Sequence, residues 1–250
     1  MSNIIKVELY KMYKRKVFIA LLILSSFSLL YALGVFFQWE FVEISGRIDL
    51  ITFYTVMWSL LMMLGIPMIM FSFYAASILG GEIQEGQILL ELSGAKSRQK
   101  LVVGKFLAIV LLISLCYVLN FLLSSLFYVL FIASTEVGST AFLDFQSYHV
   151  VLVMKSLSGF LLLIFLAALC LAFSIRFGVF RSVIFGLVIY MGLKILMYLP
   201  TINRWIPGFL ALDGQADFSA GVMLYQSGLL LLLTVAVILY AAELFRRQDF

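Results

Sequence analysis

Six long stretches of the chain consist almost wholly of apolar residues, and shorter polar segments separate them. The stretches cover 17–37, 51–79, 106–132, 150–174, 182–199 and 222–242. A helix needs about 20 apolar residues to cross the hydrocarbon core of a bilayer. The stretches are continuous and do not alternate polar with apolar residues, as the short strands of an outer-membrane barrel would. The pattern therefore predicts an all-α integral membrane protein with six transmembrane helices, forming a single domain over 1–250.

Composition strengthens this prediction. The chain is 64% hydrophobic and 12% charged, with a mean hydropathy of +1.13, whereas soluble chains have about 45–50% apolar and about 25% charged residues. A water-soluble enzyme of this size could not cover its surface with so few charges, and 24 Phe residues argue against disorder. The stretch 17–37 is too long for a signal-peptide core and has no small-residue cleavage site after it, so we expect a retained span.

Charge predicts the orientation. Most of the 17 basic residues fall on one side of the spans, namely Lys6, Lys11, Lys14, Arg15, Lys16, Lys96, Arg98, Lys100, Lys105, Arg176, Arg181, Arg246 and Arg247. Arg47, Arg204, Lys155 and Lys194 belong to the other side, together with the acidic residues Glu40, Glu43, Asp49, Glu136, Asp144, Asp213 and Asp217. The positive-inside rule then places both termini in the cytoplasm of a bacterial cell, with the spans in its cytoplasmic membrane.

Two further segments are too polar or too short to span. Over 2–16, Ile5, Leu9 and Met12 share one helical face among lysines, which favours an interfacial helix; a plain basic topology signal is the alternative. Over 200–221, aromatic and apolar residues stand among prolines and glycines. They favour an interfacial or partly re-entrant hairpin, and the alternative is a loop with membrane-interface anchors. The residues in question are Trp205, Phe209, Leu210 and Phe218.

The long inner loop, 80–105, alternates acidic with apolar residues. Ile88, Leu92 and Ala95 fall on one face of a helix, so the loop is predicted to form a short amphipathic helix that a cytosolic partner could bind. A solvated connecting helix with no partner fits the same pattern.

At this loop the sequence resembles the membrane subunits of ABC-2 type transporters. The resemblance runs through Glu85, Gly86, Gln87, Ile88, Leu92, Ser97, Arg98 and Lys105, although Gln87 stands where the family has threonine and Ala95 where it has proline. The basic stretch over 7–16 is similar to the family's N-terminal elbow helix, and 244–249 is similar to its usual ending. Order and spacing along the whole chain carry the resemblance, more than any single motif.

The resemblance implies that the inner loop is a coupling helix bound by a separate ABC ATPase subunit. The coupling residues would be Glu82, Glu85, Gly86, Ile88, Leu89, Leu92, Ser97 and Arg98. The chain has no G-x-x-x-x-G-K-[ST] motif to hold phosphates, so ATP and Mg²⁺ would be bound by the partner. A second membrane subunit, identical or related, is implied as well, and nothing points to nucleic acid.

Ionisable groups inside a membrane are candidates for function, and Lys155 and Lys194 are the only two within the predicted spans. They either extend to the outer headgroups or line an outward vestibule that attracts an anionic group. The hydroxyl and amide residues Thr55, Ser59, Tyr117, Asn120 and Ser124 either line a pathway or make helix contacts.

Three further features bear on packing and chemistry. Pro67, just after Gly65, is expected to kink the second span. Ser182 and Gly186 permit close helix approach, which we expect at a dimer seam. Cys116, Cys170 and the single His149 make neither a disulfide nor a metal site a reasonable expectation, and no set of catalytic acids, Ser/Lys dyad or cofactor ligands is found within the spans.

These observations predict the transmembrane subunit of an ATP-driven exporter, not an enzyme. The expected substrate is amphipathic or hydrophobic, first an antimicrobial or cytolytic peptide, because small chains of the resembling family without an outer domain look most like bacitracin- and lantibiotic-immunity permeases. Export of a lipid, a glycan or a small drug is the alternative, and so is a membrane scaffold or sensor that transports nothing.

Overall fold

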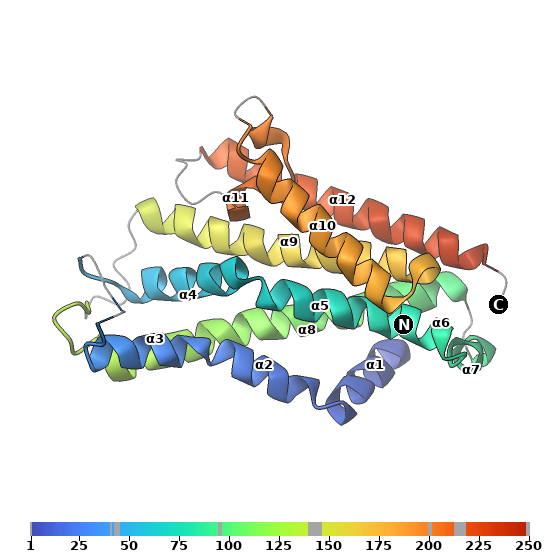
Figure 1. The fold of residues 1–250 in the computed structure, drawn as a ribbon, viewed down its shortest axis with the longest axis horizontal. Coiled ribbons are helices and arrows are strands. Elements are labelled where there is room, and N and C mark those ends of the chain that lie inside the picture. The colour runs from blue at the N-terminus through green and yellow to red at the C-terminus, as the bar shows by residue number, and fades with distance from the viewer. Residues whose placement is uncertain are drawn as a thin grey trace.

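A computed structural model describes the chain over 2–40, 42, 46–94, 97–139, 147–199, 202–212 and 219–248. Helices dominate these residues, and the described part of the chain contains no β-strand. Most of the helices run along the long axis of the molecule, and α1 (Ser2–Lys14) lies at the same end as the close of α12 (Ala220–Arg246) (Figure 1).

The prediction of six spans is confirmed at the level of helix length and composition. Six helical segments of the described chain are long and apolar enough to cross a membrane: Val17–Phe36, Ile66–Gln84, Arg98–Ile132, Tyr148–Phe177, Val179–Leu196 and Gly221–Arg246. The all-α class follows from the same helices, which fit a multi-pass membrane protein.

Two of the predicted spans consist of two helices placed end to end (Figure 1). The first span is divided into α2 (Val17–Ser25) and α3 (Phe27–Phe36) at Ser26, whose hydroxyl bonds back to the carbonyl of Leu22. The prediction of one kinked helix over 51–79 is wrong, because α4 (Leu50–Leu64) ends and α5 (Ile66–Ala76) begins at Gly65.

The break in the second span follows from local backbone chemistry. Gly65 has φ +71°, in the left-handed region that glycine enters without steric cost, so it ends α4. Pro67 lies in the first turn of α5, where its missing N–H removes no helical bond, and it therefore begins a helix instead of bending one. The apolar helix then continues through a π-helical turn, η1 (Ser77–Gly81), into α6 (Glu82–Gln84). The expected inner loop is consequently helical where it starts.

The remaining elements complete the arrangement. They are α7 (Ile88–Gly94), α8 (Arg98–Phe127), η2 (Tyr128–Ile132), α9 (Ser147–Phe177), α10 (Val179–Leu196), η3 (Asn203–Trp205) and α11 (Phe209–Leu212). Helix α9 is the centre of the bundle: 83% of its most apolar window is buried in the molecule, against 22% for α10. The outer helices therefore keep broad apolar faces for lipid.

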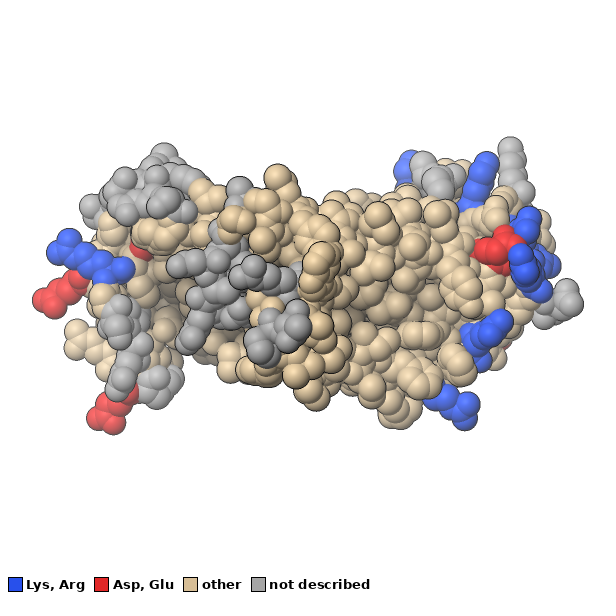
Figure 2. All heavy atoms as spheres, turned by 90° about the horizontal axis from the view of Figure 1, so that it is seen from above, with Lys and Arg blue, Asp and Glu red and all other residues tan. Residues whose placement is uncertain are grey.

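The surface agrees with a lipid environment along the middle of the molecule. Charged side chains gather at its two ends, and an uncharged band separates them (Figure 2). Large apolar side chains on the spans are widely exposed, among them Met63, Val188 and Leu232. Exposed apolar area on this scale marks contact with lipid or protein, not with water.

Small residues set the contact between α9 and α10. A Cβ atom on Gly186 would lie 2.4 Å from Sγ of Cys170, so only glycine permits this approach. Ser182 is fully buried, and its hydroxyl bonds to the carbonyl of Gly178. The expectation that Ser182 and Gly186 form a dimer seam is therefore wrong, because both are used inside the chain.

Opposite the termini, one carboxylate ties two helix starts together. Asp49 caps α4 by accepting from the backbone N–H of Thr52 at 2.8 Å, and it also accepts from the Tyr148 hydroxyl at 2.9 Å. Nε2 of His149 lies 2.7 Å from the same carboxylate. Burial opposes ionisation of Asp49, but these contacts outweigh it and hold its pKa below the ordinary value. The α4 and α9 ends are thereby joined.

The chain between α10 and α12 turns back into the molecule. Phe209 and Leu210 of α11 are buried, and Trp205 is exposed, with its ring 5.7 Å from that of Tyr225. Gly208 has φ +83° and lies so close to α9 that a Cβ would stand 2.8 Å from a methyl of Leu162. The described part of the segment therefore fits the hairpin prediction better than a surface loop, whereas Phe218 lies outside the described residues.

Candidate functional site

A fully buried lysine lies at the end of the molecule that carries both termini. Lys105 of α8 places Nζ 2.7 Å from Oε1 of Glu8 and 2.8 Å from Oε2 of Glu91, and it also pairs with Glu82. The partners belong to α1, α7 and α6 respectively. An isolated buried ammonium would be very costly, so these carboxylates are what allow Lys105 to be charged there.

A second lysine completes the network. Nζ of Lys11, on α1, lies 3.0 Å from Glu8 and 2.7 Å from Glu82, and it also pairs with Glu91. Partial burial disfavours its charge, but the hydrogen bonds to Glu82 and Glu91 outweigh burial and raise the pKa of Lys11 above its ordinary value. Two ammonium groups thus bind the same three carboxylates.

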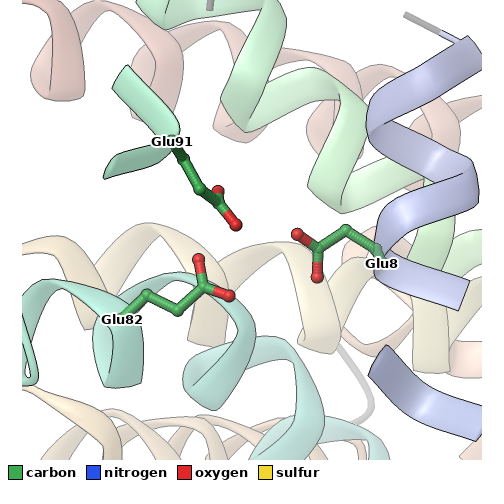
Figure 3. A group of neighbouring side chains, drawn as sticks. All are labelled: Glu8, Glu82 and Glu91. Carbon is green, nitrogen blue, oxygen red and sulfur yellow. The ribbon is translucent and has the colours of Figure 1, made fainter. Parts of the chain in front are cut away.

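The three carboxylates point toward one another from three separate segments (Figure 3). Their oxygens lie within 4.8 Å of one another, a spacing that would suit a metal ion. The two lysines already contact all three, so their two positive charges offset most of the negative charge at this point. For Glu91, burial opposes ionisation, but the bonds and charges of Lys105 and Lys11 outweigh it and lower the pKa.

Three glycines let these segments come close enough. A Cβ on Gly104 would lie 2.9 Å from a methyl of Ile4, so α1 packs directly on the backbone of α8 beside Lys105. A Cβ on Gly80 would lie 2.8 Å from the carbonyl oxygen of Ser174, which fixes η1 against α9. Gly86 has φ +72°, and its N–H bonds to the carbonyl of Ile83, which ends α6 and turns the chain into α7.

The structure sorts the predicted coupling residues into buried and exposed sets. Glu82 and Ile88 are buried, and Leu92 is half-buried against the core, so these three hold the loop on the bundle. Glu85, Gly86 and Leu89 are exposed. The expectation that Glu82 and Ile88 face a partner is therefore wrong. Part of the predicted face cannot be placed, because Ala95 and Lys96 lie outside the described residues.

Ser97 and Arg98 have a different position from the rest of the motif. Ser97 precedes α8 with extended backbone, and its side chain makes no capping bond. The Arg98 guanidinium donates to the carbonyl of Gln248 at 2.7 Å and to that of Arg246 at 3.4 Å. Cations are favourable at a helix C-terminus, so Arg98 joins the start of α8 to the end of α12.

The exposed face of the loop includes an apolar pair. Leu89 and Leu90 are adjacent on α7, and Leu90 is 79% exposed. Glu85 and Gln87 form a hydrogen bond at 2.7 Å beside them. The exposed surface of the loop, which we call the loop face, comprises Gln84, Glu85, Gly86, Gln87, Leu89 and Leu90.

Of the five polar residues considered for a pathway, two form hydrogen bonds within the bundle, and a third is buried in it. The Thr55 hydroxyl bonds to the carbonyls of Ile51 and Thr52 in its own helix. The Tyr117 hydroxyl bonds to Ser156 of α9 at 2.9 Å, and the Tyr117 ring meets that of Trp58 edge to face. Asn120 is fully buried in α8, and neither of its side-chain polar atoms finds a partner among the described residues.

Ser124, one turn further along α8, is also fully buried, and its hydroxyl has no partner within the described chain. Ser59 is the exception among the five, because it is exposed and lines a cavity. The two lysines of the predicted spans, Lys155 and Lys194, line the same cavity. The structure thus brings these three predicted residues together and separates them from Tyr117, Asn120 and Ser124.

The sequence interpretation missed the ion-pair network and the exposure of Leu90. Lys105 stands between Gly104 and a long apolar run, and Glu82 stands between Gly81 and Ile83. A charged residue so close to an apolar stretch needs a partner of opposite charge, and this position in the sequence could have indicated that Lys105 and Glu82 are ion-paired. Which partners they find depends on how α1 crosses α8, and no local pattern contains that information.

Comparison with protein-family models and with curated proteins gives no match for this chain.

Proposed function

We propose that the chain is the transmembrane subunit of an ATP-driven exporter of the ABC-2 type, with a separate ABC ATPase bound at the loop face. The observation that carries the proposal is the attachment of that face. Glu82 and Glu91, which flank it in the sequence, are ion-paired with Lys105 at the start of a span and with Lys11 on α1. A force applied to the loop would therefore reach α8 and α1 directly.

The charge pattern and the surface support the same proposal. The loop face lies at the end where α1 begins and α12 closes, and this end carries most of the basic residues of the chain. We infer that this end is cytoplasmic, that α1 is the interfacial elbow helix, and that the membrane is the bacterial cytoplasmic membrane. An exposed Leu89–Leu90 pair outside the apolar band is a reasonable contact for a cytosolic protein.

Within this proposal the substrate is amphipathic or hydrophobic, and a peptide that already lies in the membrane is the first candidate. Lateral entry between spans would spare such a molecule the transfer of its apolar face through water. ATP and Mg²⁺ belong to the partner subunit, and a second membrane subunit, identical or related, completes the transporter. Export of a lipid, a glycan or a small drug is the second candidate.

The experiment measures ATPase activity in complexes purified through the tagged chain from its native membrane. We expect wild-type complexes to hydrolyse ATP, and Leu90→Asp or Glu85→Lys to lose this co-purifying activity while the chain still inserts. A wrong charge in a small interface costs several kcal/mol, on the order of a thousandfold in affinity. Leu90→Met, which keeps the apolar contact, is the matched control. Equal activity in all four preparations would contradict the proposal and favour a scaffold or sensor.

A further inference from the structure

A cavity of about 400 Å³ lies between the start of α10 and the segment formed by η1 and α6. The turn that follows α1 closes it from a third side, because Arg15 belongs to its lining. Both α1 and α6 lie at the end of the molecule where α12 closes (Figure 1). The volume is within the range of about 300–1,000 Å³ that is usual for ligand pockets, so the cavity is large enough for a small polar group.

The cavity lies where candidate spans begin or end. Arg15 comes just before the first of these spans, Glu85 directly follows the second, and Phe180 is the second residue of the fifth. The apolar part of the lining is open to the outside, since Phe180 is 75% exposed and Phe73 is 51% exposed. Charged groups and the phenyl rings of the spans thus border one cavity. Pockets of this kind, with a basic side chain at the ends of spans, suit lipid headgroups.

The cationic group of the cavity is presented by a tight turn. Lys16 has φ +58°, which is uncommon in a residue other than glycine, and its N–H bonds to the carbonyl of Tyr13. The chain turns there from α1 into α2, next to Arg15. Arg15 is exposed and takes part in none of the salt bridges formed by the described residues. Its guanidinium is therefore available to an anion, and its planar fork of N–H donors matches two oxygens of a phosphate.

The same cavity also presents carboxylates. Glu82 is buried and already bound by the two lysines of the ion-pair network. Glu85 is exposed and accepts a hydrogen bond from Gln87 at Oε2, while its Oε1 has no partner among the described residues. No salt bridge within the described chain joins Arg15 to Glu85, although both line the cavity. A ligand that satisfies both needs an anionic group and, close to it, a cation that donates hydrogen bonds.

We propose that this cavity binds the headgroup of an amine-bearing phospholipid, with the phosphate at Arg15, the primary ammonium at Glu85 and the acyl chains along Phe73 and Phe180. A phosphoethanolamine headgroup carries both charges on a short linker. A quaternary ammonium has no N–H to donate to the carboxylate, and an anionic headgroup without an amine would set a negative charge beside Glu85. The site requires only these residues, so it stands independently of transport and of an ATPase.

The test measures lipid binding to the purified full-length chain in a neutral alkyl maltoside by native mass spectrometry. The probe is dioleoylphosphatidylethanolamine, and we expect one saturable site. Binding should be about fivefold tighter than that of dioleoylphosphatidylcholine, whose nitrogen carries three methyl groups, or of dioleoylphosphatidylglycerol, which has no amine. Free phosphoethanolamine, which has the head without the chains, should bind far more weakly.

Variants locate the headgroup and its direction. Arg15→Gln should weaken binding of all three phospholipids about fivefold, because each has the phosphate. Glu85→Gln should weaken only the ethanolamine lipid and remove its preference over the choline lipid, without weakening the glycerol lipid. Arg181→Gln is the matched control, since Arg181 is an exposed arginine at the start of α10 that does not line the cavity. Thermal unfolding without lipid verifies that each variant is folded.

Several results would overturn the inference. They are equal affinity for the three phospholipids, and undiminished binding of the ethanolamine lipid to the Arg15→Gln/Glu85→Gln double variant. Equal losses in Arg15→Gln and Arg181→Gln would do the same, because attraction by the overall positive charge of this end would then explain the binding. Free phosphoethanolamine that binds as tightly as the lipid would replace the lipid by a soluble ligand. The measurement needs no ATPase, so its failure and that of the co-purification experiment are separate.

Discussion

Lys105 and Glu8 form a buried ion pair, with 2.7 Å between Nζ and Oε1, although 97 positions separate them in the sequence. The pair fixes α1 to the beginning of α8. Because Glu82 and Glu91 share the same ammonium, the loop between two spans is fixed at the same point. The network thus joins α1, the loop and α8 at one point.

Lys105→Met should therefore be strongly destabilising. It leaves three carboxylates around the single ammonium of Lys11, and removing one partner from a buried ion network costs about 3–5 kcal/mol. Unfolding in a mild detergent, followed by denaturant titration, measures the loss. Lys100→Met is the control, because Lys100 is exposed on the same helix and surface substitutions usually stay within about 0.5 kcal/mol. Similar stabilities for both variants would show that the network contributes little.

Glu91 and Lys11 should make docking of the loop depend on pH in a defined direction, whereas Glu82, whose pKa is raised mainly by burial, acts in the opposite direction to Glu91. The pKa of Glu91 is lowered in the folded chain, so its contribution is present above the ordinary carboxyl pKa and is lost as pH falls through the folded value. The pKa of Lys11 is raised, so its contribution is lost only when pH rises far above neutral. Hydrogen exchange should show the backbone of 82–94 protected near neutral pH and opening below about pH 4. Protection that is unchanged down to pH 3 would contradict this assignment.

Gly186→Ala should weaken the contact between α9 and α10. The added Cβ would lie 2.4 Å from Sγ of Cys170, and overpacking of this kind costs about 1–3 kcal/mol. Gly192→Ala on the same helix meets nothing within 4 Å and should be neutral or slightly stabilising. Cys170→Ala in the Gly186→Ala background should restore part of the loss. A change of oligomeric state without loss of stability would instead place Gly186 at an interface between subunits.

The proposed orientation predicts the labelling of single cysteines by an impermeant thiol reagent in intact cells. Gln87→Cys, on the loop face, should be shielded, and Glu136→Cys, at the opposite end, should react. The native Cys116 and Cys170 are fully buried, so the background should be low without removing them. Labelling of Gln87→Cys from outside would reverse the topology and remove the basis for the ATPase contact.

Much of the fold could be predicted from the sequence because lipid imposes a simple rule on length and polarity. The six apolar runs and the helix over 2–14 follow from composition and period alone. The break at Gly65 and the helical start of the inner loop depend on backbone conformations that a hydropathy pattern does not record. For this reason the predicted span over 51–79 is wrong in its interior, and the helical segment there that is long enough to span runs over Ile66–Gln84.

The candidate sites were harder to predict, since their residues come from distant segments. Glu85, Gly86 and Leu89 are exposed as expected, whereas Glu82 and Ile88 are buried by tertiary contacts. Lys155 and Lys194 could be selected as unusual residues in apolar runs, but only the crossing of α9 and α10 shows that they share a cavity. The residue types in the sequence indicated which side chains could belong to a site. The tertiary arrangement of the helices determines which of them lie close together.

The interruption at Gly65 gives the two halves of the second span separate anchors. The α4 half is held at its start by the contacts of Asp49 and carries Ser59 on the wall of the cavity between α4 and α10. The α5 half runs on through η1 to Glu82 and hence to the ion-pair network. Only Gly65, in the left-handed conformation, lies between them, so the two halves are two helices and not one continuous helix. The two segments of this span are therefore anchored at opposite ends of the molecule.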